Sequence, residues 1–186
     1  MSENFNTYIP HIEPDYWRRL CTQLGCLRHY ERGEAFAREG EPARYIGYVA
    51  AGALKYVTGS DDGEEHVIGL EYDGGFVADF PFSLYGLDAR ASIVATAPSE
   101  IYCVEARRIG EMMQSDSQLK DIVMKSTEAI FATLYDRYKS LYNCSPARRY
   151  EMLLSTHSDI FARFPLKDIA SYLDISPTHL SRLRHL

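Results

Sequence analysis

The residues best suited to recognising another molecule lie close to the C-terminal end of the chain. One face of a helix that is predicted to begin at Pro177 carries Thr178, His179, Ser181, Arg182 and His185. Hydroxyl, imidazole and guanidinium groups hydrogen-bond to the edges of nucleic-acid bases, and the planar fork of arginine matches O6 and N7 of guanine. Arg182 is therefore the best candidate for reading a base. A helix whose polar face is merely solvated has the same spacing, so this alternative stays open.

Two short helices joined by a tight turn are needed to hold this face in place. Ile169, Ala170 and Leu173 form the apolar side of the first helix, and the small side chain of Ala170 lets the two helices cross closely. Ser176 is suited to cap the second helix, with Pro177 in its first turn. The spacing predicts a helix-turn-helix, whose second helix enters the major groove of DNA. Further contacts with DNA are then expected from Lys167, Ser176, Pro177 and Arg184. For Arg184 we expect a contact with a phosphate.

Residues 27–104 have a different pattern. Glycines recur and separate short segments rich in β-branched and aromatic residues, among them 45–49, 54–57, 66–70 and 92–95. Such spacing is typical of antiparallel all-β domains. Asp62-Gly63 fits a tight turn between two of these segments, because glycine readily adopts a positive φ angle. The sequence therefore predicts an antiparallel β-roll.

Residues 117–142 contain neither glycine nor proline and predict one long helix. Apolar positions recur at steps of three and four. At 1.5 Å per residue the helix would be roughly 39 Å long, which is more than a small roll covers. Its first half could pack on the chain's own sheet, or the helix could pair with the same helix of a second subunit. We expect a dimer, with an interface formed by Leu119, Val123, Ile130, Leu134, Arg137 and Leu141.

The composition excludes several classes of protein. The chain has 186 residues, of which 46% are hydrophobic and 25% charged, with four cysteines; this is ordinary globular composition, unlike a disulfide miniprotein or a disordered tail. No apolar run is long enough to cross a bilayer, so we expect a cytoplasmic protein without membrane contact. The net charge is −6, yet residues 145–186 hold six Lys or Arg against four Asp or Glu. A basic module beside an acidic remainder favours a nucleic-acid partner for the C-terminal part.

Patterns for catalysis or metal binding are absent from the sequence. There is no His-x-His pair, no serine elbow and no phosphate-binding glycine loop with its lysine. The four cysteines are not grouped as an iron–sulfur cluster requires. We therefore predict that the protein is not an enzyme and has no metal site.

Together these features resemble the Crp/Fnr transcription regulators, especially their Bacteroidetes-type branch. The resemblance rests on the glycine-spaced roll, on the long helix and on the motif Pro-Leu-x-x-Ile-Ala-x-Tyr-Leu-x-Ile-Ser-Pro-x-x-Leu-Ser-Arg-x-Arg at 165–184. It implies an α+β fold with an antiparallel β-roll of the double-stranded β-helix type and an N-terminal helix over 1–116. A dimerisation helix over 117–143 and a winged-helix-like helix-turn-helix domain over 144–186 would follow.

The resemblance also implies partners. A homodimer would bind a palindromic site in double-stranded DNA, and RNA polymerase is a further expected partner. The family's two strongest base readers, an arginine and a glutamate, correspond here to Pro177 and Thr178, while the later arginine is kept as Arg182. The DNA sequence that this chain recognises should therefore differ from the family's best-known operator.

In cyclic-nucleotide-binding members of that family, a Phe-Gly-Glu segment and a later Arg-Ser hold the sugar and phosphate, and a hydroxyl of the long helix meets the base. The corresponding residues here are Phe76, Ala78, Asp79, Phe80, Arg90, Ser92 and Thr133. Ala78 replaces the glycine, Asp79 is shorter than glutamate, and the segment is more apolar. No cofactor is certain: a cyclic nucleotide, another effector and an unliganded roll all stay open. An alternative function is a cyclic-nucleotide-binding module that acts through a protein partner without reading DNA.

Overall fold

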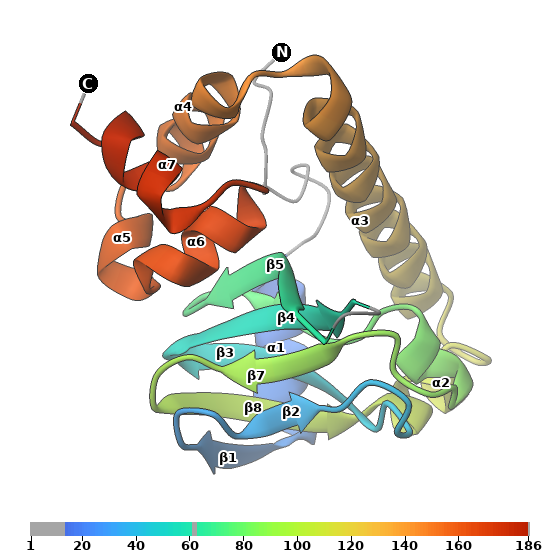
Figure 1. The fold of residues 1–186 in the computed structure, drawn as a ribbon. Coiled ribbons are helices and arrows are strands. Elements are labelled where there is room, and N and C mark those ends of the chain that lie inside the picture. Colours follow the sequence, from blue (N-terminus) through green and yellow to red (C-terminus); the bar gives the residue numbers. More distant parts are fainter. Residues whose placement is uncertain (1–13, 61–62, 186) are drawn as a thin grey trace.

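The computed structural model describes residues 14–60 and 63–185, in which two four-stranded antiparallel sheets form a roll (Figure 1). One sheet has the strand order β1-β8-β3-β6 and the other has the order β2-β7-β4-β5. The strands are β1 Cys26–Tyr30, β2 Ala35–Ala37, β3 Tyr45–Ala51, β4 Ala53–Gly59, β5 Glu65–Tyr72, β6 Phe76–Val77, β7 Ser92–Ala95 and β8 Ser99–Glu105. The predicted antiparallel roll is confirmed.

Apolar side chains from both sheets meet inside the roll. They are Phe36, Val49, Leu54, Val77, Ile93, Ile101 and Cys103. Gly47 lies in the middle of β3, where a Cβ atom would be 2.6 Å from Cγ2 of Ile101, so a glycine permits this close packing of the strands. Gly63 has the positive φ angle of +82° expected for the turn before β5, while Asp62 of the same predicted turn lies outside the described residues.

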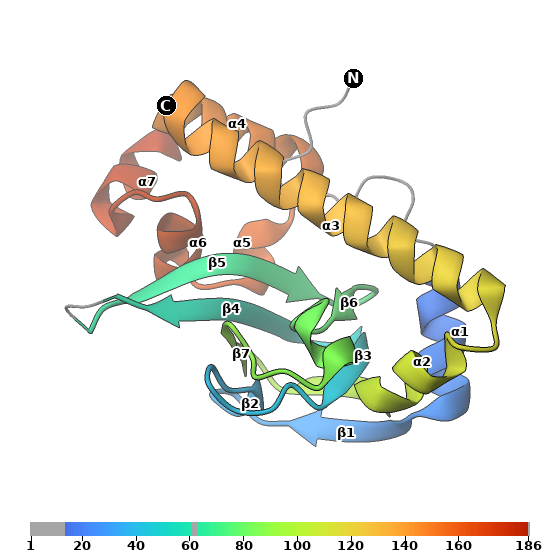
Figure 2. The same cartoon turned by 90° about the vertical axis from the view of Figure 1, so that its right-hand side faces the viewer.

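One side of the roll is covered by α1 Pro14–Leu24, the 3₁₀ helix η1 Phe82–Tyr85, α2 Ala106–Met112 and the first half of α3 Ser117–Asn143; Figure 2 labels α1, α2 and α3. Trp17 of α1 is fully buried, and its ring centroid lies 4.7 Å from that of Phe76. Its Nε1–H donates to Oγ of Ser126, at 3.0 Å. Because these contacts join α1, β6 and α3, they fix the direction in which the long helix leaves the roll.

The long helix has clear end signals. Asp116 caps its start by accepting a hydrogen bond from the backbone N–H of Leu119, at 3.0 Å. At the other end Cys144 is extended, with φ −113° and ψ 141°, and Ser145 caps the next helix. The helix therefore has the bounds that the sequence predicts, whereas the division into three domains stays a prediction.

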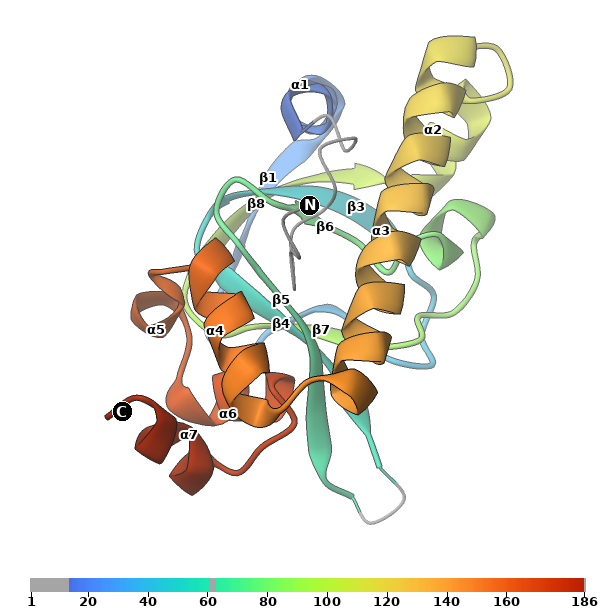
Figure 3. The same ribbon diagram turned by 90° about the horizontal axis from the view of Figure 1, so that it is seen from above.

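The C-terminal helices are α4 Pro146–Thr156, α5 Ile160–Arg163, α6 Leu166–Tyr172 and α7 Pro177–Leu183, and α6 packs on β5 (Figures 1 and 3). Leu153, Ile169 and Leu180 share one apolar cluster with residues of β4 and β5. The interface also holds polar contacts: Nζ of Lys55 lies 3.3 Å from Oδ1 of Asp168, and the backbone N–H of Val67 donates to Oγ of Ser171 at 2.9 Å. The helix-turn-helix is thus packed against the roll.

Candidate functional site

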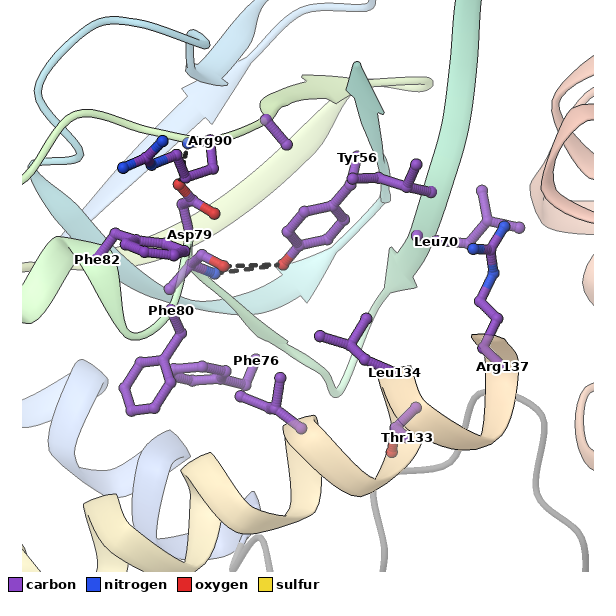
Figure 4. Close-up of a pocket in the computed structure, with 15 residues that line it drawn as sticks. Tyr56, Leu70, Phe76, Asp79, Phe80, Phe82, Arg90, Thr133, Leu134 and Arg137 are labelled. Carbon is purple, nitrogen blue, oxygen red and sulfur yellow. Dashed lines mark hydrogen bonds between the residues drawn. The ribbon is translucent and has the colours of Figure 1, made fainter. Parts of the chain in front are cut away.

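A cavity of about 260 Å³ lies between the β4–β5 sheet, the segment after β6 and the middle of α3 (Figure 4). Its lining is mostly apolar. The lining residues are Tyr56, Ile68, Gly69, Leu70, Phe76, Ala78, Asp79, Phe80, Phe82, Arg90, Ala91, Ile130, Thr133, Leu134 and Arg137. Since residues from strands, a loop and the long helix converge here, the cavity is a candidate ligand site.

Most residues predicted to bind a ligand do line this cavity. They are Phe76, Ala78, Asp79, Phe80, Arg90 and Thr133. Ser92 is not among the lining residues, because its hydroxyl accepts a hydrogen bond from the backbone N–H of Glu39 at 3.0 Å. The hydroxyl of Thr133 donates to the carbonyl of Ala129 in its own helix, at 2.9 Å. The cavity therefore unites the predicted set apart from Ser92.

The polar groups of the segment after β6 have partners within the chain. The hydroxyl of Tyr56 donates to the carbonyl of Ala78 at 3.4 Å and accepts from its N–H at 3.3 Å (Figure 4). Oδ2 of Asp79 accepts the backbone N–H of Arg90. Burial raises the pKa of Asp79, while this hydrogen bond and the charge of Arg90 act in the opposite direction. Because the N–H of Ala78 is engaged and Asp79 is turned to the backbone, these groups do not fit a cyclic phosphate and its ribose.

Tyr56 was missed by the sequence analysis, although a signal was present. Leu54 and Tyr56 are two residues apart in β4 and therefore share one face of the strand. Leu54 is fully buried inside the roll, and Tyr56 packs against the same cluster. Burial raises the pKa of Tyr56, so its hydroxyl stays neutral. The alternation of the strand could thus have placed this hydroxyl inside.

The cavity has an arginine at each end. On the roll side, Cζ of Arg90 lies 5.4 Å from the ring centroid of Phe82, and Asp79 is beside it (Figure 4). On the helix side, Nη2 of Arg137 donates to the carbonyl of Tyr172 at 3.0 Å and to that of Val67 at 3.5 Å. Its Cζ lies 4.8 Å from the Tyr172 ring centroid. Arg137 therefore borders the cavity and also joins α3 to α6.

The prediction of the dimer interface needs correction. Leu119 and Val123 have 0% and 4% of their surface exposed, because both pack against α1 and the roll within the subunit. Ile130 packs on the edge of the same cluster, and Arg137 makes the contacts within the subunit described above. Of the predicted set, Leu134 is exposed and Leu141 is half-buried.

A different face of α3 is open. Its large exposed side chains are Met124, Phe131, Leu134, Tyr135, Tyr138 and Tyr142. Two ring pairs form along it: Phe131 stacks on Tyr135 with centroids 6.1 Å apart, and Tyr138 lies 5.0 Å from Tyr142. Such a row of apolar and aromatic side chains is unusual on a free surface and is a candidate interaction face.

The second helix of the helix-turn-helix has one buried and one exposed side. Leu180 is fully buried, whereas the predicted DNA-binding residues are exposed or, for Ser181, half-buried. Oγ of Ser176 accepts the backbone N–H of His179 at 3.2 Å, which confirms the predicted cap. Asp174 supplies the turn with a φ angle of +54°.

Cζ of Arg184 lies 4.2 Å from the ring centroid of Phe161, so this side chain is held against α5. Lys167 is exposed at the start of α6, and Pro177, Thr178, Arg182 and His185 are exposed along α7 and just after it.

Known proteins share the sequence pattern of the roll and the fold of the chain. Residues 27–116 match the family model of the cyclic nucleotide-binding domain. The structure of FixK2 from Bradyrhizobium japonicum is similar with a TM-score of 0.76 and 18% identity, covering 87% of this chain and 83% of that chain. TTHB099 of Thermus thermophilus, a transcriptional regulator of the CRP family, has a TM-score of 0.65 and 15% identity, with coverages of 85% and 82%. The c-di-GMP responsive regulator CLP of Xanthomonas campestris is similar with a TM-score of 0.64 and 17% identity, covering 90% of this chain and 88% of that chain.

These likenesses give the fold over 85–90% of the chain. The resemblance predicted from the sequence is confirmed at that level, and the comparisons do not distinguish between branches of the family. A sequence search among curated proteins gives no match. Among the described residues, none of the helices has the length and apolar character needed to span a membrane.

Proposed function

Because residues 27–116 match the cyclic nucleotide-binding domain and the chain has the fold of the Crp/Fnr regulators, we propose that it is a DNA-binding transcription regulator of this type. The observation that carries the proposal is the two-sided second helix of the helix-turn-helix. Its apolar side is buried through Leu180, and its polar side is exposed at the surface of the subunit. Family likeness and surface chemistry thus support the same partner, double-stranded DNA.

The helix-turn-helix exposes groups suited to base edges and groups suited to the phosphates of DNA. Arg182 is exposed and forms no ion pair with the described residues, so its guanidinium can turn to a guanine. Lys167 at the start of α6 and Arg184 after α7 are suited to phosphates. Since Pro177 and Thr178 lack the donors of an arginine and the acceptors of a glutamate, Arg182 would carry most of the sequence specificity.

A homodimer is the second part of the proposal. The exposed aromatic face of α3 is the best candidate for the contact between subunits, because burying it would remove a large apolar surface from water. Two subunits related by a two-fold axis would present two recognition helices about 34 Å apart, as a palindromic site in DNA requires. RNA polymerase as a further partner stays a prediction.

The cavity supports gating by a small effector. A ligand can shift the position of the recognition helices only if it binds one arrangement better than the other. The engaged groups of Ala78 and Asp79 count against a cyclic nucleotide in this role. A module that binds such a nucleotide and acts only through a protein partner is therefore less well supported than the DNA-binding regulator.

The test is selection of DNA by the purified protein. Repeated capture from a pool of random duplexes should enrich a motif with two-fold symmetry, and the selected duplex should bind far more tightly than a scrambled one. Replacing Arg182 by Ala should weaken binding by about 1–3 kcal/mol per half-site and relax the preference at one base pair.

The matched control is Arg107→Ala, which removes the same charge from α2, where the side chain is 84% exposed. This variant should bind like the wild type. If no motif is enriched and no duplex is retained even at low salt, the DNA-binding proposal is wrong. Equal losses for Arg182→Ala on selected and scrambled DNA would remove its role in reading bases.

A further inference from the structure

We propose that the cavity binds a small hydrophobic carboxylate. In this proposal Arg137 binds the carboxylate and couples its binding to the release of α6 from β5. The regulatory half of this inference rests on the proposed function, whereas the ligand half does not. Arg137 was expected at a dimer interface, and its contacts within the subunit point to this different role.

The first observation is a buried donor without an acceptor. Nε–H of Arg137 is inaccessible to solvent and has no hydrogen-bond partner of ordinary geometry among the described residues, although the hydroxyl of Tyr172 interacts with the same guanidinium. Such a group is rare, because leaving a buried donor unsatisfied costs much of its hydration free energy. A ligand in the adjoining cavity that brings an acceptor oxygen would satisfy it once the guanidinium turns toward the cavity, because Nε exposes no surface in the present arrangement.

The second observation is the distribution of charge in the cavity. Among the described residues that line it, Asp79 is the only acidic one, and it lies beside Arg90 at the roll end (Figure 4). An anion at that end would meet the carboxylate of Asp79 as well as the charge of Arg90. At the helix end, Arg137 has Leu70 and Leu134 as its neighbours in the lining, and none of the acidic residues that the structure describes lines that end. An anionic group is therefore favoured next to Arg137.

The third observation is the apolar character of the remaining lining. The lining includes the apolar side chains of Ile68, Leu70, Phe76, Phe80, Ile130 and Leu134. Burying a hydrocarbon chain or ring there is favourable by about 25 cal/mol per Å² of apolar surface. A sugar hydroxyl in the same place would lose its hydrogen bonds to water. The volume of about 260 Å³ fits a molecule the size of a medium-chain fatty acid or an arylalkanoic acid.

The fourth observation connects the cavity with the helix-turn-helix. A carboxylate that binds an arginine side-on takes the hydrogens of Nε and Nη2 together. In this structure Nη2 is the nitrogen that donates to the carbonyl of Tyr172, the last residue of α6, and to that of Val67. The ligand would therefore compete for the guanidinium edge that holds α6 against β5. Binding in the cavity and release of α6 would be coupled through one side chain.

The ligand half is tested by calorimetry with matched probes: octanoate and 4-phenylbutyrate, their primary amides, and cyclic AMP. We expect the carboxylates to bind the full chain about ten- to a hundredfold more tightly than the amides, which have the same shape but no charge. Cyclic AMP should bind more weakly than either carboxylate. Equal binding of acids and amides, or no binding of either acid at millimolar concentration, would overturn the proposal.

Two variants locate the charge. Arg137→Gln removes the positive charge and the Nε–H, and it should lose most of the preference for acid over amide. Arg90→Gln removes the arginine at the other end and should keep that preference. The reverse pattern would assign the carboxylate to Arg90 and refute the role of Arg137. Circular dichroism of both variants checks that they are folded, and the probe comparison on the wild-type protein does not depend on either of them.

The regulatory half is tested by measuring DNA affinity with and without octanoate. We expect the carboxylate to change the affinity of the wild-type protein for its selected duplex at least about fivefold, and the affinity of Arg137→Gln by less than twofold. If octanoate binds but leaves DNA affinity unchanged, the coupling through Arg137 is wrong while the ligand site stands. If no DNA is bound at all, the proposed function fails, and the calorimetry still decides about the ligand.

Discussion

The two halves of α3 carry the same kind of apolar stripe but use it differently. In the first half, Leu119, Ile122, Val123 and Ala129 are buried against α1 and the roll. In the second half, four aromatic side chains are between 54% and 75% exposed, namely Phe131, Tyr135, Tyr138 and Tyr142. The first half therefore belongs to the core of the subunit, and the second half offers a surface to a partner. An apolar stripe shows that a helix has a contact, but not with which molecule.

The largest expected effect is the difference in unfolding free energy between two Leu→Ala substitutions, one in each half of α3. Leu119→Ala removes a fully buried side chain and should lower the free energy of unfolding by about 2–5 kcal/mol. Leu134→Ala removes a side chain that is 56% exposed, so the unfolding free energy should change by less than about 1 kcal/mol. Chemical denaturation of both variants measures the difference. Equal losses would mean that the second half is packed as tightly as the first, and the comparison would fail.

The sequence was sufficient where structure is determined locally. Strands follow from segments rich in β-branched and aromatic residues, and α3 follows from a stretch without glycine or proline in which apolar positions recur at steps of three and four. The helix-turn-helix was found for the same reason, because Ala170 and Ser176 have fixed places in a motif of about twenty residues.

Contacts between distant residues were not predictable in this way. Tyr56 meets Ala78, and Arg137 meets Tyr172, because the sheet and the long helix bring separate segments together. Neither pair has a recurring spacing in the sequence. Leu119 and Val123 were placed in the dimer interface because their periodicity is the same on both halves of the helix. The segment at 76–90 that was expected to bind a ligand does line the cavity, whereas the lining residues on β5 and most of those on α3 were missed. That a ligand binds there stays a prediction.

A charge on the exposed half should break the dimer and leave the fold intact. Tyr138→Glu places a carboxylate in the aromatic face, and burying it between subunits without a cation would be costly. We expect the dimer dissociation constant to rise at least about thirtyfold, which corresponds to about 2 kcal/mol. Analytical ultracentrifugation over a concentration series measures it.

The control for this variant is Tyr85→Glu, which makes the same change at a residue of η1 that is 72% exposed. Its dimer dissociation constant should match that of the wild type. If Tyr138→Glu stays dimeric at the same concentrations, the aromatic face is not the interface, and the subunits must meet elsewhere. If the wild type is a monomer throughout, the dimer itself is excluded.

The smallest effect is expected from replacing two serines of α3, one in each half of the helix. Ser126 is fully buried and accepts the Nε1–H of Trp17, so Ser126→Ala leaves an indole donor without an acceptor. This should lower the free energy of unfolding by about 1–3 kcal/mol.

Ser140 is 4% exposed, but its hydroxyl donates to the carbonyl of Arg137 in the same helix, so Ser140→Ala removes only a local hydrogen bond. Its effect should stay below about 0.5 kcal/mol, because that carbonyl remains part of the helical ladder. Denaturation curves of the two variants compare a contact between elements with a contact inside one. A larger loss for Ser140→Ala would show that the second half depends on its buried side chains as much as the first does.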